Sequence, residues 1–193
     1  MKTFDEYVAQ AEQVHGHICA GQILGVRMAL YGLRLLGIAD PDATDRKRLV
    51  AFVEIDRCAS DAVGVVTGCR LGRRSLRVRD FGKAAATFYD LAAGRAVRVV
   101  ARDSARQRAR ELHPEIQDRK QQQIVAYREM PDEELFEAQR VRMKVCPEEL
   151  PGYKAPPVTC ACCGESIHFK REVVREGRAL CRFCAGERYY EPL

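Results

Sequence analysis

The stretch "VHGHICAGQILGVRMALYGLRLLG", residues 14–37, places potential metal ligands directly before a long apolar segment. His15, His17 and Cys19 occupy alternate positions, so an extended backbone would point all three side chains the same way. Apolar residues dominate from residue 22 onward, and Gly37 follows the last of them, which predicts a mostly buried helix that ends at a glycine cap. A cluster of imidazole and thiol groups is therefore expected at the start of a core helix.

Three explanations of this cluster remain open: a metal site, an activated thiol, or side chains that only cap the helix end. Cys19 lies where the helix dipole and free N–H groups favour a thiolate. Cys58, in "EIDRCASDAVG", likewise follows a predicted strand and precedes a predicted helix. Because strand-to-helix junctions can meet at one sheet edge, His15, His17, Cys19 and Cys58 could share one pocket. Sulfur with imidazole suits zinc, and also iron, nickel or copper.

The order of predicted elements indicates an α+β core rather than a regular β-α-β alternation. A capping box of Thr3 and Glu6 begins a first helix. After the loop at residues 39–45, the patterns predict strands at 48–55, 75–81, 84–92 and 96–102. A short helix at 60–68, which ends at Gly68, is expected between the first two strands. An arginine-rich helical region at 104–139 and a further strand at 141–145 follow.

Composition limits the class of protein. The 193 residues allow one core domain and a small appendage, and the net charge of +5 permits an anionic ligand without requiring one. No apolar run is long enough to cross a bilayer, and the N-terminus lacks a signal-peptide core, so we expect a cytoplasmic protein with no membrane contact. Nine cysteines in a reducing compartment favour metal binding or thiol chemistry over disulfides.

Four cysteines near the C-terminus have the spacing of a structural zinc site. Cys160 and Cys163, then Cys181 and Cys184, form two C-x2-C pairs separated by seventeen residues. Four thiolates would close the coordination sphere and leave no catalytic position, whereas a pair of reducible disulfides is the alternative. Cys162 is a spare thiol. The finger could be a ribbon or a treble clef, and the sequence after the second pair favours the clef.

Prolines and a glycine mark the boundary between the two parts. We assign residues 1–146 to the core domain, 147–158 to a linker and 159–193 to the zinc finger. Arginines on the finger are diluted by glutamates, and we identify no aromatic stacking platform in the sequence, so protein contact is favoured over nucleic acid.

Four successive motifs together resemble the FmdE family, which is associated with formylmethanofuran dehydrogenase. They are "HGHICAGQILGVRMA", "EIDRCASDAV", "TGCRLGRRSL" and "DFGKAAATFYD", in the family's order over most of residues 10–95. Ala20 stands where the family usually has proline, which removes a rigid turn but no ligand. The resemblance implies an α+β core, a homodimer, and a pocket centred on His17, Cys19 and Cys58, with further residues nearby: His15, Asp61, Cys69 and Lys83.

The resemblance also implies a functional class. Formylmethanofuran dehydrogenase is a molybdenum- or tungsten-dependent oxidoreductase whose catalytic centre belongs to other polypeptides than the FmdE proteins. The sequence shows no molybdopterin domain and no iron–sulfur signature, so we expect a metal-binding accessory protein with an oxidoreductase partner. The alternatives are a metal- or thiol-dependent enzyme, for which Cys19, Cys58 and Asp61 are the candidate catalytic residues, and a zinc-finger regulatory or ligand-sensing module. The expected metals are one zinc in the finger and a second ion in the core, for which zinc, iron and nickel are candidates.

Overall fold

The computed structural model describes residues 2–41 and 48–191, and the chain divides into two compact units, 1–144 and 145–193. The first unit is built on a five-stranded sheet of order β2-β1-β3-β4-β5. Its strands are β1 (Leu49–Val53), β2 (Leu76–Val78), β3 (Ala85–Asp90), β4 (Arg95–Ala101) and β5 (Phe136–Val141). The β1–β2 pair is parallel, and the other neighbouring strands of this sheet are antiparallel. The predicted α+β class is confirmed.

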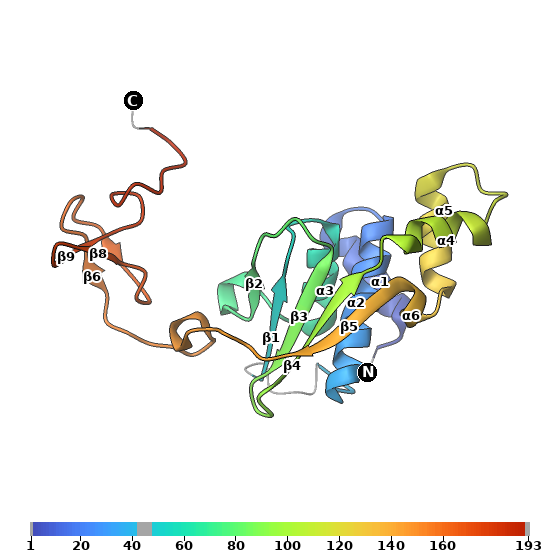
Figure 1. Cartoon of the computed structure of the whole chain (residues 1–193), viewed down its shortest axis with the longest axis horizontal. Coiled ribbons are helices and arrows are strands. Elements are labelled where there is room, and N and C mark those ends of the chain that lie inside the picture. Colours follow the sequence, from blue (N-terminus) through green and yellow to red (C-terminus); the bar gives the residue numbers. More distant parts are fainter. Residues whose placement is uncertain (1, 42–47, 192–193) are drawn as a thin grey trace. The chain divides into compact units, whose positions relative to one another are not determined.

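Three helices cover one face of this sheet (Figure 1): α1 (Phe4–His15), α2 (Ala20–Leu36) and α3 (Cys58–Thr67). Two 3-10 turns, η1 (Leu71–Arg73) and η2 (Pro147–Glu149), lie in connections. Near the end of β4 lie three more helices, α4 (Ser104–Leu112), α5 (Arg119–Glu129) and α6 (Asp132–Leu135). Side chains of the inner sheet face pack against α2 and α3, and Phe88 and Ile23 are fully buried there.

Helix ends follow the local signals of the sequence. Both hydrogen bonds of the predicted capping box are present between Thr3 and Glu6. Gly37 and Gly68 end α2 and α3 with positive φ angles of 73° and 66°, where a side chain would strain the backbone. Each predicted glycine cap is therefore confirmed.

The C-terminal part of the arginine-rich region differs from the prediction. The helical pattern was expected to run to about residue 139, but β5 begins at Phe136, and the strand expected at 141–145 starts five residues too late. β5 pairs with β4 in antiparallel register, with Phe136 opposite Ala101. Burial of Phe136 and pairing with an available strand edge override the local helical pattern. The predicted loop at 39–45 lies partly outside the described residues.

The backbones of α2 and α3 touch because α2 presents glycine to α3. A Cβ atom added to Gly25 would lie 2.5 Å from the carbonyl oxygen of Ala59 and 2.8 Å from the Cβ of Ala62. One turn earlier, a Cβ on Gly21 would lie 3.1 Å from the Cβ of Cys58. Because no side chain separates the two helices, their N-terminal ends are held together.

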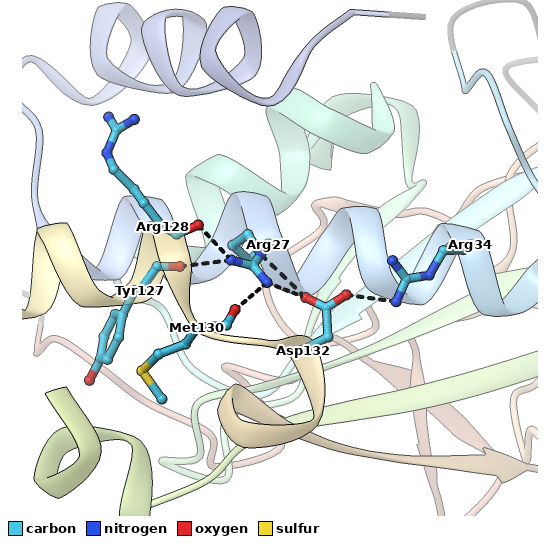
Figure 2. Close-up of polar contacts among 6 residues, drawn as sticks. All are labelled: Arg27, Arg34, Tyr127, Arg128, Met130 and Asp132. Atoms are coloured by element: carbon cyan, nitrogen blue, oxygen red, sulfur yellow. Dashed lines mark hydrogen bonds and ion pairs between the residues drawn. The ribbon is translucent and has the colours of Figure 1, made fainter. Parts of the chain in front are cut away.

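Arg27 ties α2 to the end of α5 (Figure 2). Its guanidinium donates to three carbonyl oxygens at the C-terminal end of α5, which that helix leaves without intrahelical partners: Tyr127, Arg128 and Met130, at 3.0, 3.0 and 2.7 Å. It also lies 2.7 Å from Asp132, whose other carboxylate oxygen accepts from Arg34. A single half-buried arginine therefore caps α5 and fixes the start of α6.

The second unit contains two small antiparallel strand pairs. β6 (Val158–Thr159) pairs with β7 (Ser166–Ile167), and β8 (Val173–Arg175) pairs with β9 (Arg178–Leu180). Residues 181–191 form turns and a bend and contain no helix. The helix on which the preference for a treble clef depends is therefore absent from residues 181–191, and the choice between a clef and a ribbon stays a prediction.

The close approach of α2 and α3 gives a test of the fold. Gly25→Ala should lower the free energy of unfolding by about 1–3 kcal/mol, because the added methyl group collides with the backbone of α3. Gly72→Ala is the matched control, since a Cβ there meets nothing within 4 Å, and it should change stability by less than about 0.5 kcal/mol. Urea denaturation of both variants measures the difference. Equal stability of the two variants would contradict this packing.

Candidate metal sites

Three potential ligands meet where α1 leads into α2. His15 is the last residue of α1, His17 lies in the short connection, and Cys19 is the residue before the first turn of α2. Gly16, at φ 89°, reverses the chain between the histidines and brings their ring centroids to 4.7 Å. The potential ligand atoms of His15, His17 and Cys19 all lie within 4.8 Å of one another. Such a set of two imidazoles and a thiol can bind a transition metal.

Asp61, in the first turn of α3, orients one of these imidazoles. Its Oδ2 lies 2.8 Å from the Nδ1 of His15. That contact occupies the Nδ1 of His15, so Nε2 is the ring nitrogen left to bind a ligand. A histidine that binds a metal commonly donates its other ring N–H to a carboxylate, which fixes the tautomer and the ring orientation. The Asp61–His15 pair therefore fits a metal site in its donor chemistry as well as its spacing.

Cys58, the first residue of α3, lies beside this cluster. An added Cβ on Gly21 would be 3.1 Å from the Cβ of Cys58 and 3.7 Å from the Sγ of Cys19, so the two cysteines flank that glycine. Gln22 donates to the Cys58 carbonyl oxygen at 3.1 Å. The Sγ of Cys58 is not part of the three-residue group above. The structure thus brings Cys58 next to Cys19 and leaves it at the margin of the cluster.

The Cys58 thiol differs from the sequence expectation of a stabilised thiolate. Partial burial raises its pKa, and the neighbouring Cys19 thiol raises it further. The helix N-terminus does not outweigh these two effects. Without a bound cation, Cys58 is therefore a protonated thiol at neutral pH.

One residue that the family resemblance placed near the pocket, Cys69, lies at a distance from it. Cys69 follows the far end of α3, and the ten residues of that helix separate it from the pocket by about 15 Å. Cys69 is 4% exposed within the core, where burial raises its pKa. Lys83 is exposed on the loop between β2 and β3, and its backbone N–H donates to the Glu54 carbonyl oxygen.

The second unit brings four thiols together. The Sγ atoms of Cys160, Cys163, Cys181 and Cys184 lie within 4.8 Å of one another. The Sγ atoms of Cys163 and Cys181 are 3.9 Å apart, close to the roughly 3.8 Å edge of a zinc–thiolate tetrahedron with roughly 2.3 Å bonds. Cys162 is exposed and stands outside this group. The donor set and its spacing fit a closed metal site.

Backbone N–H groups favour negative charge in this cluster. Cys181 donates its N–H to the Sγ of Cys160 at 3.3 Å, and Cys184 donates to the Sγ of Cys181 at 3.4 Å. Hydrogen bonds from the surrounding backbone lower the pKa of Cys160 to about 6. The crowded neighbouring thiols instead raise the pKa of Cys184. The first thiolate therefore forms readily, whereas four thiolates together require a cation.

The family assignment rests on comparison with known proteins. The family model described as "FmdE, Molybdenum formylmethanofuran dehydrogenase operon" matches residues 14–137, which include every residue of the first cluster. The α+β fold and its His/Cys cluster define a protein with a potential metal-binding site. The chain belongs to the FmdE family.

Two individual proteins are similar to this chain. A crystal structure of a tungsten formylmethanofuran dehydrogenase FmdE-like protein from Syntrophus aciditrophicus has a TM-score of 0.65 and 25% identity, covering 98% of this chain and 96% of that one. A protein of Archaeoglobus fulgidus named "Probable S-adenosyl-L-methionine-binding protein" is 41% identical over 91 residues. That match covers 47% of this chain, and the chain spans only a quarter of that relative's length. Within the described residues, none of the helices has the length and apolar character that a membrane span requires.

The environments of the core cysteines predict their reactivity. In metal-stripped protein, alkylation of Cys58 should have its pH midpoint above the ordinary thiol value of 9.0, because burial and Cys19 disfavour its thiolate. Cys69 should react at least about a hundredfold more slowly in native protein than in urea, since its alkylation requires opening of the core. Mass spectrometry after iodoacetamide pulses measures both, with glutathione as the reference thiol. A Cys58 midpoint below that of glutathione, or fast native labelling of Cys69, would contradict these environments.

Proposed function

We propose that this chain is a metal-binding accessory protein of a molybdenum- or tungsten-dependent oxidoreductase, with an open transition-metal site in its core and a structural zinc in its C-terminal unit. The observation that supports the core site most strongly is the cluster of His15, His17 and Cys19 with Asp61 on His15. The family and the similar crystal structure support the association with such an oxidoreductase.

Three residues would hold the core ion: His15 and His17 through ring nitrogens, and Cys19 through its thiolate. Cys58 stands beside Cys19. Its thiol would be either a further metal ligand or a group that contacts a small molecule bound to the metal. Three protein ligands leave one position open, which is the arrangement of catalytic and ligand-binding sites. A metal ion bound there would supply Lewis acidity. Asp61 would keep the His15 ring oriented, with its Nδ1 proton held by the carboxylate.

The four-cysteine cluster would hold zinc for a structural reason. The second unit has only short strand pairs, and its described residues include few buried apolar side chains, among them Ile167. A unit of this size needs a cross-link to be stable, and a tetrahedral zinc joins both C-x2-C turns. Zinc also suits four thiolates without an open position.

The zinc assignment predicts that one cysteine substitution removes the zinc and that a neighbouring one does not. Cys181→Ala should abolish zinc binding by the C-terminal unit, because three thiolates leave the tetrahedron open. Cys162→Ser is the matched control, and it should keep the metal, since Cys162 stands outside the cluster. Metal content per chain by mass spectrometry, with proteolysis of residues 145–193 as a folding readout, tests both variants. Loss of zinc in the Cys162 variant or its retention in the Cys181 variant would overturn the ligand set.

The core site predicts a second metal that is lost independently. Wild-type protein purified without chelator should hold one metal beyond the C-terminal zinc, and Cys19→Ser should remove only that metal. Asp61→Asn should keep the site but weaken its affinity about 10–100-fold, because His15 loses its orienting carboxylate. Cys69→Ala is the control and should keep both metals. One metal per chain in wild-type protein, with a Cys19 thiol that is alkylated without added chelator, would support the thiol-dependent enzyme instead.

The accessory role has its own test. The tagged chain, purified from its native cells, should carry molybdenum or tungsten in a stable complex with the oxidoreductase. A chain that is recovered free of both elements, and that catalyses a reaction alone, would be an enzyme in its own right. The name of the Archaeoglobus relative does not make S-adenosylmethionine a ligand of this chain, because three quarters of that relative lies beyond the matched chain. The homodimer implied by the family resemblance remains a prediction, which light scattering tests.

A further inference from the structure

A polar cavity in the first unit is lined by none of the clustered histidines or cysteines. Its volume is about 540 Å³, within the range of small-molecule sites, and it lies among the ends of β1 and β4, the first turns of α4, and α5. Leu24, Ile55 and Val100 form an apolar wall. The remaining lining is strongly basic.

Four cations and a single carboxylate, Asp103, line this cavity. Two of the cations have partners: Arg98 forms a double hydrogen bond with Glu54 at 2.6 and 2.7 Å, and Arg102 donates to backbone carbonyl oxygens of the α6–β5 region. The other two are Lys83 and Arg106. Among the residues that the structure describes, Lys83 has no side-chain hydrogen bond or ion pair, and Arg106 interacts with the Tyr127 hydroxyl and forms no ion pair.

Tyr127 adds a neutral hydrogen-bond donor to these cations. Figure 2 shows its ring extending from α5 toward α4, and its side chain lines the cavity. Burial raises the pKa of the Tyr127 phenol, with a smaller opposing effect from Arg106, so the hydroxyl keeps its proton at neutral pH. Arg27 holds the Tyr127 carbonyl oxygen at 3.0 Å and thereby fixes the end of α5 that carries this ring.

We infer that this cavity binds a small organic anion, whose carboxylate or phosphate group contacts Lys83, Arg106 and Tyr127 while a short apolar body lies against Leu24 and Ile55. Two cations without carboxylate partners and a phenol donor match an oxyanion in charge and hydrogen bonding. With a neutral ligand, Asp103 would be the single carboxylate among the lining residues, against four cations. The inference goes beyond the proposed function and stands without it, because none of these residues belongs to either metal cluster.

The cavity nevertheless shares its framework with the core cluster. Leu24 lies five residues after Cys19 on α2, about 7.5 Å along the helix axis, and Ile55 precedes Cys58 by three residues. An anion in the cavity would therefore contact two elements that also carry the cysteines: α2, which follows Cys19, and the strand-to-helix connection that leads to Cys58.

The test is an amide NMR titration of the full zinc-loaded chain with three probes of one shape: benzoate, phenyl phosphate and the uncharged benzamide. We expect benzoate, phenyl phosphate or both to shift the amides of Lys83 and Arg106 with millimolar affinity, and benzamide to leave them unchanged. The stronger of the two anions identifies the head group as carboxylate or phosphate. Lys83→Gln and Arg106→Gln should each weaken binding about tenfold, since each removes a charge-assisted hydrogen bond.

Arg110→Gln is the matched control. It removes the same charge from α4 one turn after Arg106, outside the cavity lining, and should leave the affinity unchanged. The spectra also report whether each variant is folded. No shift with either anion at tens of millimolar, equal binding of benzamide, or an equal loss in the Arg110 variant would overturn the inference. Binding in a Cys19→Ser variant should persist, which separates this result from the fate of the metal site.

Discussion

The contact of α2 with α3 at Gly21 and Gly25 is the constraint on which the core site depends. A Cβ at either position would press against Cys58 or the backbone of Ala59. Only glycine lets the two helix N-termini approach this closely, and the approach places Cys58 beside Cys19 and Asp61 against His15. The cluster of His15, His17 and Cys19 forms locally where α1 leads into α2, and the packing of α3 on α2 adds Asp61 and Cys58 to it.

Arg27 extends this framework to the other half of the domain. It lies on α2 two turns after Cys19. Its guanidinium donates hydrogen bonds to the carbonyl oxygens at the end of α5 and to the carboxylate of Asp132. Breaking such a part-buried ion pair would leave several polar groups without partners. Through this network α2 positions both the His/Cys cluster and the tyrosine that lines the basic cavity. One helix thus organises a candidate metal site and a candidate anion site through two of its neighbours, α3 and α5.

Local signals in the sequence identified the elements that depend on local chemistry. The capping box at Thr3 and the glycine caps at Gly37 and Gly68 are determined by a few neighbouring residues, and the structure has all three. The start of β5 at Phe136 and the lack of a helix in residues 185–191 could not be read this way, because strand pairing with β4 and the turns around the cysteines are decided by contacts across the chain. The raised pKa of Cys58 has the same origin, since it reflects burial and the proximity of Cys19. No pattern in the sequence links Arg27 to residues 127–132, about a hundred positions away.

We propose that the His/Cys cluster of the core binds a transition metal through Cys19 and at least one of the two histidines. The most direct measurement is a crystal structure of protein purified without chelator, with anomalous diffraction recorded at the absorption edge of each metal found in the sample. We expect an anomalous peak about 2.3 Å from the Cys19 Sγ and about 2.0–2.1 Å from an imidazole nitrogen, in addition to the peak among the four C-terminal cysteines. A peak at the four cysteines alone, with density for a free Cys19 thiol, would contradict it.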